Sequence, residues 1–292
     1  SLSYHCKSAA PGSQEYYLNH SHRLTYVILN AEKCMVQVKS LSCRKNDYAR
    51  TKRGYIYLIE DLFYGVSRLK VVLRIGGSVI ASPPNPHLMN KYVEIIRRLL
   101  GEKHQVVVVV GGGKPARDFI QLAKKMGLEE REQDEVAISA SRIMAQLVAM
   151  KLGGYGWKDI PRSLSDAVAA LGERGIVVMG GLKPGMTTDA VAALVALEVD
   201  ADLIIKATNQ DGVYTKDPEK YADAEKIDEI TFEDLSKLLE KDKHVAGIHQ
   251  IIDPEAVRIL KKKRIRMLVI NGFNPQNVIA ALKGERIGTV IE

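Results

Sequence analysis

A repeated pattern of apolar strand, glycine turn and helix constrains this sequence more than any other feature. Its clearest instance is 106–110, five consecutive valines that run into Gly111-Gly112-Gly113 and then into a helical stretch. Such a run of β-branched residues indicates a central strand that is covered by helices on both faces. The pattern starts at 70–75 and recurs to the end of the chain. We therefore predict an α/β fold, a three-layer αβα sandwich with a mostly parallel central sheet.

The pattern also predicts where the individual elements lie. Strands are expected at 70–75, 106–110, 176–179, 203–207, 267–270 and, at the sheet edge, 288–291. Helices are expected at 88–100, from 113 to about 126, and at 134–151, 163–171, 190–199, 231–239, 254–262 and 275–282. Within 134–151, the apolar residues predicted to face the core are Val136, Ile138, Ile143, Leu147 and Met150.

Residues 1–68 differ in composition from the rest. They hold all three cysteines, eight of the twelve tyrosines, ten Lys/Arg and five Asp/Glu, a net charge of +5; the other 224 residues carry 32 basic and 30 acidic side chains, a net of +2. Two short patches, 25–29 and 55–59, favour β structure, but no alternation of strands and helices develops. We expect 1–68 to be a poorly ordered extension, or upstream sequence translated from a start codon placed too early, and 69–292 to be the functional domain.

Several classes of protein are disfavoured. The longest apolar runs are too short to span a bilayer, and the sequence opens with no apolar signal segment, so we expect a cytoplasmic protein. The cysteine spacings match no CxxC metal site. The basic run 261–264 closes a predicted helix, where lysines favour the helix dipole, so we expect no nucleic-acid partner.

Three strands end in loops that suit phosphate. In Gly76-Gly77-Ser78 and Gly111-Gly112-Gly113, missing Cβ atoms would let backbone N–H groups approach an anion. The third loop, 183–190, places Thr187, Thr188 and Asp189 at a helix start, where they either cap the helix or bind phosphate and orient cations. Neither a Walker A motif nor GxGxxG is present, so any ATP must be held by another architecture.

Taken in order, these segments resemble the amino-acid kinase superfamily, and within it the archaeal uridylate kinases. The motifs are VVLRIGGSV (71–79), VVVVVGGGKPARDFI (106–120), VVMGGLKPGMTTDAVAALVA (177–196), KATNQDGVYTKDP (206–218) and KGERIGTVIE (283–292). The resemblance implies transfer of a phosphoryl group from ATP, with Mg²⁺, to the phosphate of UMP. It also implies a homo-oligomer, a hexamer, with an acceptor half at about 69–180 and an ATP half at about 181–292.

The resemblance assigns residues to each substrate. UMP would be held by Gly112, Arg117, Asp134, Pro184, Gly185, Met186, Thr187, Thr188, Asp189 and Ala190. ATP would be held by Gly77, Ser78, Gly113, Thr208, Asn209, Tyr214 and Asp217, with Gly212 permitting the turn that brings Tyr214 over the nucleotide. Purely structural roles stay open for two of these residues. Arg117 could pair with Asp118 or Glu129, and Asp134 could cap a helix.

Catalysis is assigned to Arg74 and Asp189. Many members of the superfamily have lysine where this chain has Arg74; the charge is kept, and Asp189 matches the carboxylate that orients such cations. Lys206 is the lesser candidate, because its strand could point it elsewhere; no metal ligands are assigned.

Alternatives are a kinase of the same superfamily for an isopentenyl phosphate or an acylamino acid, and a non-catalytic oxyanion-binding protein. The absence of histidine between His104 and His244 counts against the isoprenoid acceptor.

Overall fold

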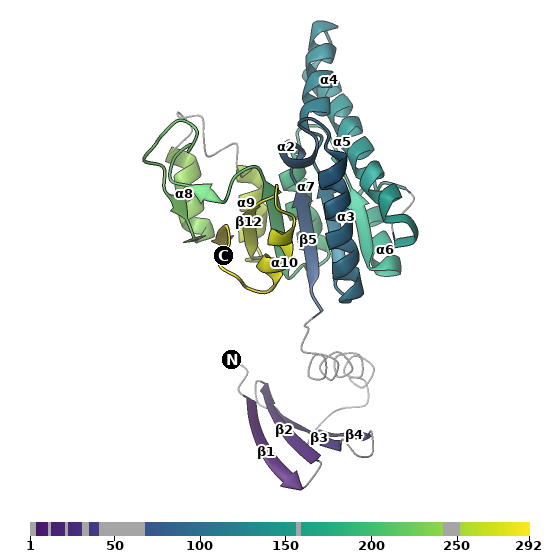
Figure 1. Ribbon diagram of the computed structural model, residues 1–292, viewed down its shortest axis with the longest axis vertical. Coiled ribbons are helices and arrows are strands. Elements are labelled where there is room, and N and C mark those ends of the chain that lie inside the picture. Colours follow the sequence, from purple (N-terminus) through teal and green to yellow (C-terminus); the bar gives the residue numbers. More distant parts are fainter. Residues whose placement is uncertain are drawn as a thin grey trace. The chain divides into compact units, whose positions relative to one another are not determined.

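The computed structural model describes residues 4–10, 13–20, 23–30, 35–40 and 241 by their backbone, and residues 68–155, 159–240 and 252–292 in full (Figure 1). The chain divides into two compact units, 1–67 and 68–292.

The first unit contains an antiparallel sheet of four strands in chain order. They are β1 (Tyr4–Ala10), β2 (Ser13–His20), β3 (Arg23–Asn30) and β4 (Met35–Ser40). The β-prone patch at 25–29 lies within β3, and the patch at 55–59 lies outside the described residues. These strands lie within the extension, and its degree of order, its origin and its role stay predictions.

A seven-stranded sheet forms the centre of the second unit, in the order β11-β13-β12-β8-β5-β6-β7. Its strands are β5 (Lys70–Ile75), β6 (Gln105–Val110), β7 (Ile176–Met179), β8 (Leu203–Thr208), β11 (Glu229–Ile230), β12 (Met267–Asn271) and β13 (Thr289–Ile291). All neighbours pair in parallel except β12 and β13. The prediction of a mostly parallel sheet is confirmed. The prediction that 288–291 lies at the edge is wrong, because the short β11 pairs outside it.

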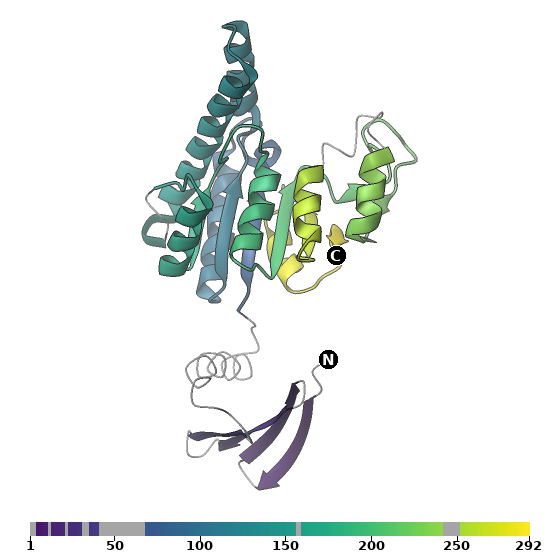
Figure 2. The ribbon, with the colours of Figure 1, turned by 180° about the vertical axis from the view of Figure 1, so that it is seen from behind.

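Helices cover both faces of this sheet (Figures 1 and 2). One face carries α2 (Gly77–Ile80), α3 (Pro86–Gly101), α5 (Glu130–Leu152) and α10 (Gln276–Leu282), and the other carries α6 (Leu164–Arg174), α7 (Thr188–Glu198), α8 (Phe232–Lys241) and α9 (Pro254–Lys261). Strand side chains alternate between the two cores: Val71 and Leu73 pack with the α3 side, whereas Val72 packs with the α7 side. The three-layer α/β architecture is confirmed.

Helices α4 (Gly113–Lys125) and α5 form a hairpin that extends beyond the sheet (Figure 1). By length and composition alone, α5 with the turn after it could cross a membrane, but its buried residues pack within the domain. Those buried residues include Ser141, Met144 and Val148. The predicted core residues Ile143, Leu147 and Met150 are instead 56%, 48% and 67% exposed. The prediction is confirmed for Ile138, which is buried, and wrong for these three residues, because α5 is apolar on two sides.

Short elements complete the unit. They are the 3₁₀ turn η2 (Gly153–Tyr155) and the two-stranded ribbon of β9 (Val213–Tyr214) and β10 (Lys226–Ile227). This ribbon, together with α2 and β11, was not predicted, because each element is too short to show periodicity.

Candidate active site

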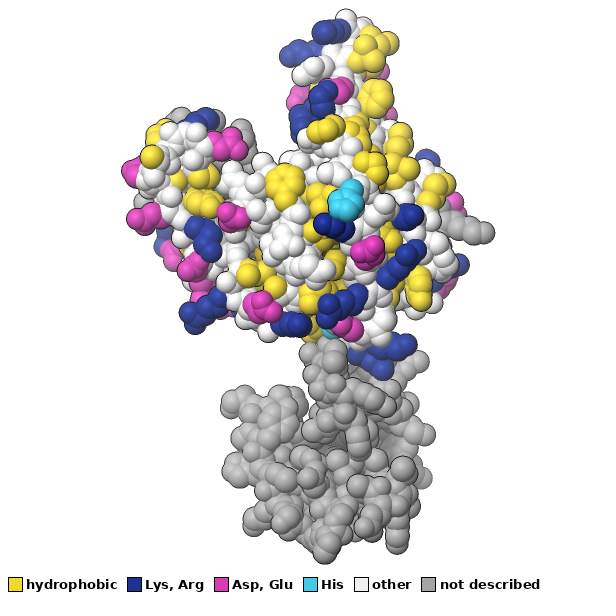
Figure 3. Space-filling view, viewed as in Figure 1, with side chains coloured by type: hydrophobic (Ala, Val, Ile, Leu, Met, Phe, Trp, Pro, Cys, Tyr) yellow, Lys and Arg dark blue, Asp and Glu magenta, His cyan; other side chains and the backbone are white. Residues whose placement is uncertain are grey.

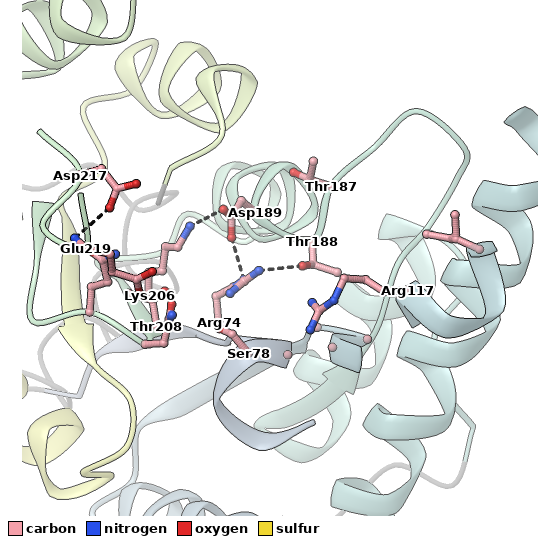
Figure 4. A pocket seen from close by; sticks show the side chains of 17 residues that line it. Arg74, Ser78, Arg117, Thr187, Thr188, Asp189, Lys206, Thr208, Asp217 and Glu219 are labelled. Carbon is pink, nitrogen blue, oxygen red and sulfur yellow. Dashed lines mark hydrogen bonds and ion pairs between the residues drawn. The ribbon is translucent and has the colours of Figure 1, made fainter. Parts of the chain in front are cut away.

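The register of two adjacent strands brings two cations together at the carboxyl end of the sheet. Arg74 of β5 lies directly opposite Lys206 of β8 in a parallel pair. Both positions alternate with residues that pack on the α3 side, so both side chains face the start of α7. Asp189, in the first turn of α7, meets them there (Figure 4). We call Arg74, Asp189 and Lys206 the charge cluster.

The charge cluster is held by close ion pairs. Arg74 Nε lies 2.6 Å from Asp189 Oδ1, and Lys206 Nζ donates a hydrogen bond to Asp189 Oδ2. Arg74 Nη2 also donates to Thr188 Oγ1 at 3.1 Å. Asp189 is 9% exposed and Lys206 only 2%. The expectation that the strand might direct Lys206 elsewhere is therefore wrong.

Burial and charge act on the carboxyl and the amine in different directions. Burial raises the pKa of Asp189, but the charges of Arg74 and Lys206 outweigh it and hold that pKa below its usual value. Burial lowers the pKa of Lys206, and the Asp189 carboxylate opposes that shift. With both cations charged, the cluster has one positive charge in excess, which favours an anion beside it.

Helix capping does not account for Asp189. Thr187 is the N-cap of α7, and its hydroxyl accepts a hydrogen bond from Ala190 N at 3.1 Å. The same hydroxyl donates to Asp253, which caps α9. Of the two readings of this loop, capping belongs to Thr187, while the carboxylate of Asp189 serves the two cations.

The two glycine loops contact each other. A Cβ on Gly77 would stand 2.2 Å from Gly113 N, and Gly113 has a φ of +63° with Ala81 O only 2.3 Å from its own ideal Cβ. Glycine is thus required here for loop-to-loop packing as well as for any approach to an anion.

A cavity of about 630 Å³ opens over these loops and the charge cluster. Figure 4 shows the side chains that line it, which come from β5, α2, α4, α7, β8, the turns before α4 and α7, and the segment that follows β8. A smaller pocket of about 160 Å³ adjoins it, since both are lined by Gly112 and Thr188. The smaller pocket lies between α5 and the loop before α7, and Asp134, Gly181 and Met186 contribute to its wall. The arrangement offers two adjoining compartments.

Arg117 lies on the wall of the larger cavity, where it is exposed to solvent. Its Nη2 donates to Ser82 Oγ at 2.9 Å. Asp118, the neighbour that could have paired with it, is instead bound by Lys114 at 2.6 Å. Arg117 therefore presents a guanidinium to the cavity, consistent with an anionic ligand.

Asp134 does not cap a helix, because α5 begins earlier, at a capping box formed by Glu129 and Glu132. Its Oδ2 accepts a hydrogen bond from Gly185 N at 2.7 Å. The carboxylate thus fastens the loop before α7 while it lines the smaller pocket.

The segment after β8 supplies the far wall of the larger cavity, with Asn209 and Asp217 beyond the last strand residue, Thr208. Asp217 is 9% exposed; its Oδ1 accepts from Glu219 N at 3.0 Å, and its Oδ2 lies 3.3 Å from Lys220 Nζ. A Cβ on Gly212 would stand 2.5 Å from Thr289 Oγ1, so this glycine is needed for packing against β13.

Most of the predicted site residues line these two spaces, but some do not. Pro184, Gly185, Ala190 and Tyr214 are not among the lining residues. Gly185 and Ala190 contribute backbone hydrogen bonds to the loop instead. The structure adds residues that the sequence reasoning missed, namely Gln210, Glu219 and Asp253. Gln210 lines the cavity with a buried Oε1 that has no hydrogen-bond partner among the described residues. No spacing signal marks these residues, because they come close only in the fold.

Comparison with known proteins identifies the family. A uridylate kinase of Methanocella arvoryzae is 41% identical over 224 residues, which cover 77% of this chain and 100% of the relative. One of Methanothermobacter thermautotrophicus is 38% identical over 76% of this chain and 99% of the relative. The crystal structure of uridylate kinase from Archaeoglobus fulgidus is 37% identical, with a TM-score of 0.69, covering 77% of this chain and 100% of that one. Residues 70–271 match the model of the amino acid kinase family, and the chain belongs to that family.

Proposed function

We propose that residues 69–292 transfer the γ-phosphoryl group of ATP to the phosphate of UMP, a step in the synthesis of pyrimidine nucleotides. The observation that carries the proposal is the pair of adjoining spaces, the larger of which is lined by both Arg117 and the charge cluster. Relatives named uridylate kinase, matched over nearly their whole length, support the same substrate.

On the acceptor side, the smaller pocket would take the nucleoside of UMP and Arg117 its phosphate. A planar guanidinium suits a phosphate dianion because two N–H groups can bind two oxygens. Asp134 accepts a hydrogen bond from Gly185 N at Oδ2, so its Oδ1 would accept hydrogen bonds from the ribose hydroxyls. The neighbouring loop residues assigned from the resemblance, 184–190, would close around this nucleotide.

On the donor side, the glycine loops, Ser78 and the segment from Thr208 to Asp217 would hold ATP. Arg74 and Lys206 then stand beside the group in transfer, with Asp189 fixing both. Phosphoryl transfer needs alignment of the two phosphates and neutralisation of charge, and the phosphate of UMP is itself the nucleophile. We therefore expect direct transfer with no covalent intermediate on the enzyme.

Magnesium belongs to this proposal as a partner of ATP. The Asp189 carboxylate is committed to two cations, and within 68–155, 159–241 and 252–292 no group of three His, Cys, Asp or Glu forms a metal site. Such a surface fits an ion that keeps its waters and binds chiefly through substrate phosphates. When bound, Mg²⁺ would neutralise charge on the transferring phosphates.

The test is a panel of acceptors with ATP and Mg²⁺: UMP, CMP, dUMP, isopentenyl phosphate and N-acetylglutamate, with ADP formation as the readout. We expect UMP to give the highest kcat/KM. Preferential use of another acceptor would overturn the substrate, and binding of oxyanions without ADP formation would favour the storage alternative.

We also propose that the enzyme self-associates through an apolar stripe on the α4–α5 hairpin. The stripe consists of Phe119, Leu122, Met126, Ile143, Leu147 and Met150, each at least 45% exposed. Figure 3 shows apolar side chains gathered along this hairpin. An exposed patch of this kind is typical of an interface, and a second copy would supply a matching surface. A cytoplasmic homohexamer, as the resemblance implies, would use it within its dimers.

Sedimentation of wild type and Leu147→Glu tests this surface. We expect the variant to form smaller particles, because a carboxylate would be buried in the contact; an unchanged particle mass would contradict the assignment. The matched control is Gln121→Glu, which adds the same charge at an exposed position of α4 on the side of that helix away from Phe119 and Met126.

We further propose that residues 1–68 are dispensable. A chain that begins near residue 66 should keep its thermal stability and its activity with UMP. Loss of folding on trimming would contradict this.

A further inference from the structure

The loop between β7 and α7 is fastened to helix α5 by side chains rather than by backbone pairing. Ser141 Oγ accepts from Gly181 N at 2.8 Å, and Asp134 Oδ2 accepts from Gly185 N. Arg142 supplies two more bonds, with Nε donating to Gly181 O at 3.0 Å and Nη2 donating to Leu182 O at 3.1 Å. Side chains of α5 thus satisfy backbone N–H and C=O groups along the whole loop.

Helical spacing explains how a single helix reaches the whole loop. Asp134 precedes Ser141 by seven positions and Arg142 by eight, which places all three along one side of α5, two turns apart. Asp134 holds the tip of the loop, while Ser141 and Arg142 hold its base. The same side carries Ile138, which joins Asp134 and Ser141 in lining the smaller pocket.

Arg142 makes no ion pair with a described acidic residue, so its contact with the loop is its principal polar role. Burial lowers the pKa of its guanidinium, and the nearby charge of Arg162 lowers that pKa further. A cation kept in this setting without an acidic partner needs good acceptors. The carbonyls of Gly181 and Leu182 provide them, and the planar fork of guanidinium donors matches two successive carbonyls.

We propose that Arg142 is a positioning residue for the loop between β7 and α7, which we call the acceptor loop. Arg142 holds this loop in the conformation that binds the nucleoside monophosphate. The proposal rests on the function proposed above, since it assigns this loop to the acceptor. Arg142 lies in the middle of a helix, outside the glycine motifs and outside the loop whose charged residues were assigned to the site. Without the two bonds from Arg142, the base of the loop would be free to move, and binding of the acceptor would have to order it.

This role predicts an asymmetry between the substrates. The loop and Asp134 bound the smaller pocket, whereas Asn209 and Asp217 bound the larger cavity away from α5. Losing Arg142 should therefore raise the KM for UMP and leave the KM for ATP within about twofold of wild type. Loss of two charged hydrogen bonds corresponds to roughly a tenfold change or more.

The experiment compares wild type with Arg142→Met, Arg142→Lys and the control Arg131→Met. Methionine has similar length but no donor, and lysine keeps the charge without the fork. Arg131 lies on the same helix, is exposed and pairs only loosely with Glu135, at 3.7 Å. KM for each substrate, kcat and thermal stability are measured for all four proteins. We expect the KM for UMP to rise roughly tenfold in the methionine variant, less in the lysine variant and not in the control.

A role in stability alone would lower the active fraction and leave both KM values unchanged, which would overturn the proposal. An equal rise of both KM values would overturn it too. If the methionine variant fails to fold, hydrogen exchange on the lysine variant decides: the amides of Gly181 and Gly185 should exchange faster than in wild type without any substrate. Unchanged exchange there would refute the role. If wild type does not phosphorylate UMP, the proposed function fails, but this exchange test of the loop still stands.

Discussion

The charge cluster and the proposed acceptor side of the same cavity are built on opposite principles. In the cluster, Asp189 and Lys206 are buried and every charge already has a protein partner. On the proposed acceptor side, Arg117 is exposed to solvent, and its hydrogen bond goes to the neutral hydroxyl of Ser82. One part is complete without a ligand, whereas the other keeps a charge available for one.

Under the proposed function, this difference predicts separate roles for the two parts in turnover and in substrate binding. A preformed cluster needs no rearrangement when charge moves during transfer, which is how electrostatic stabilisation lowers a barrier. A solvent-accessible guanidinium is hydrated until the substrate arrives, so it contributes chiefly to binding and selection. Changes in the cluster should act on turnover, and changes on the acceptor side should act on the use of UMP.

The largest effect is expected for Asp189→Asn. The substitution keeps the shape but leaves Arg74 and Lys206 as two close cations without their shared anion, so kcat should fall by roughly 10²–10³-fold. The KM values should change far less. Steady-state kinetics check this, with Asp166→Asn, in the first turn of α6, as a control that should retain activity. If the Asp189 variant binds its substrates more weakly and keeps its kcat, the charge cluster acts in substrate binding and the predicted separation of roles is wrong.

Arg117→Ala should come next. Removing the guanidinium leaves the acceptor phosphate without its charged partner, which costs about 2–3 kcal/mol, or roughly 30- to 150-fold in kcat/KM for UMP. The measurement is kcat/KM for UMP at saturating ATP. Lys114→Ala on the same helix should be near neutral, because that lysine is paired with Asp118. If the affinity for UMP is unchanged in the Arg117 variant, the acceptor assignment is wrong.

A smaller effect is expected for Asp217→Ala. Its carboxylate fixes the turn that lines the ATP side through Glu219 N, so the KM for ATP should rise by about tenfold or less. Titration of ATP at fixed UMP measures it, with Asp223→Ala, an exposed partner of Lys216, as the control. If instead only the KM for UMP rises, Asp217 lies on the UMP side of the cavity and the proposed assignment of the two substrates is reversed.

The smallest effect concerns acid stability. Because the pKa of Asp189 is lowered in the folded protein, its ionised form stabilises the fold above its ordinary pKa of about 4, and this contribution is lost as pH falls through the folded value. Urea unfolding of wild type and Asp189→Asn should therefore show a stability difference that narrows below about pH 4. A difference independent of pH across this range would mean that the charge of Asp189 adds nothing to stability.

The sequence by itself determined the layers of this protein and most of its binding loops. Valine runs and glycine turns report local physics, namely the burial of a strand on both faces and the backbone freedom of a turn, and so they can be read without the fold. The family motifs grouped Gly77, Gly113, Arg117 and Asp189 in one site, and all four line the larger cavity. The apolar pattern of α5 gave a wrong prediction for Leu147 and Met150. The spacing of such residues in the sequence is the same whether their side of the helix packs on the core or is exposed.

Only the tertiary structure decided which charges meet. Arg74 and Lys206 are 132 positions apart, and their meeting depends on β5 and β8 pairing in one register. The fastening of the acceptor loop by Arg142 depends likewise on α5 lying beside it. Such contacts follow from the pairing of distant segments, and a local pattern in the chain carries no record of which segments will pair.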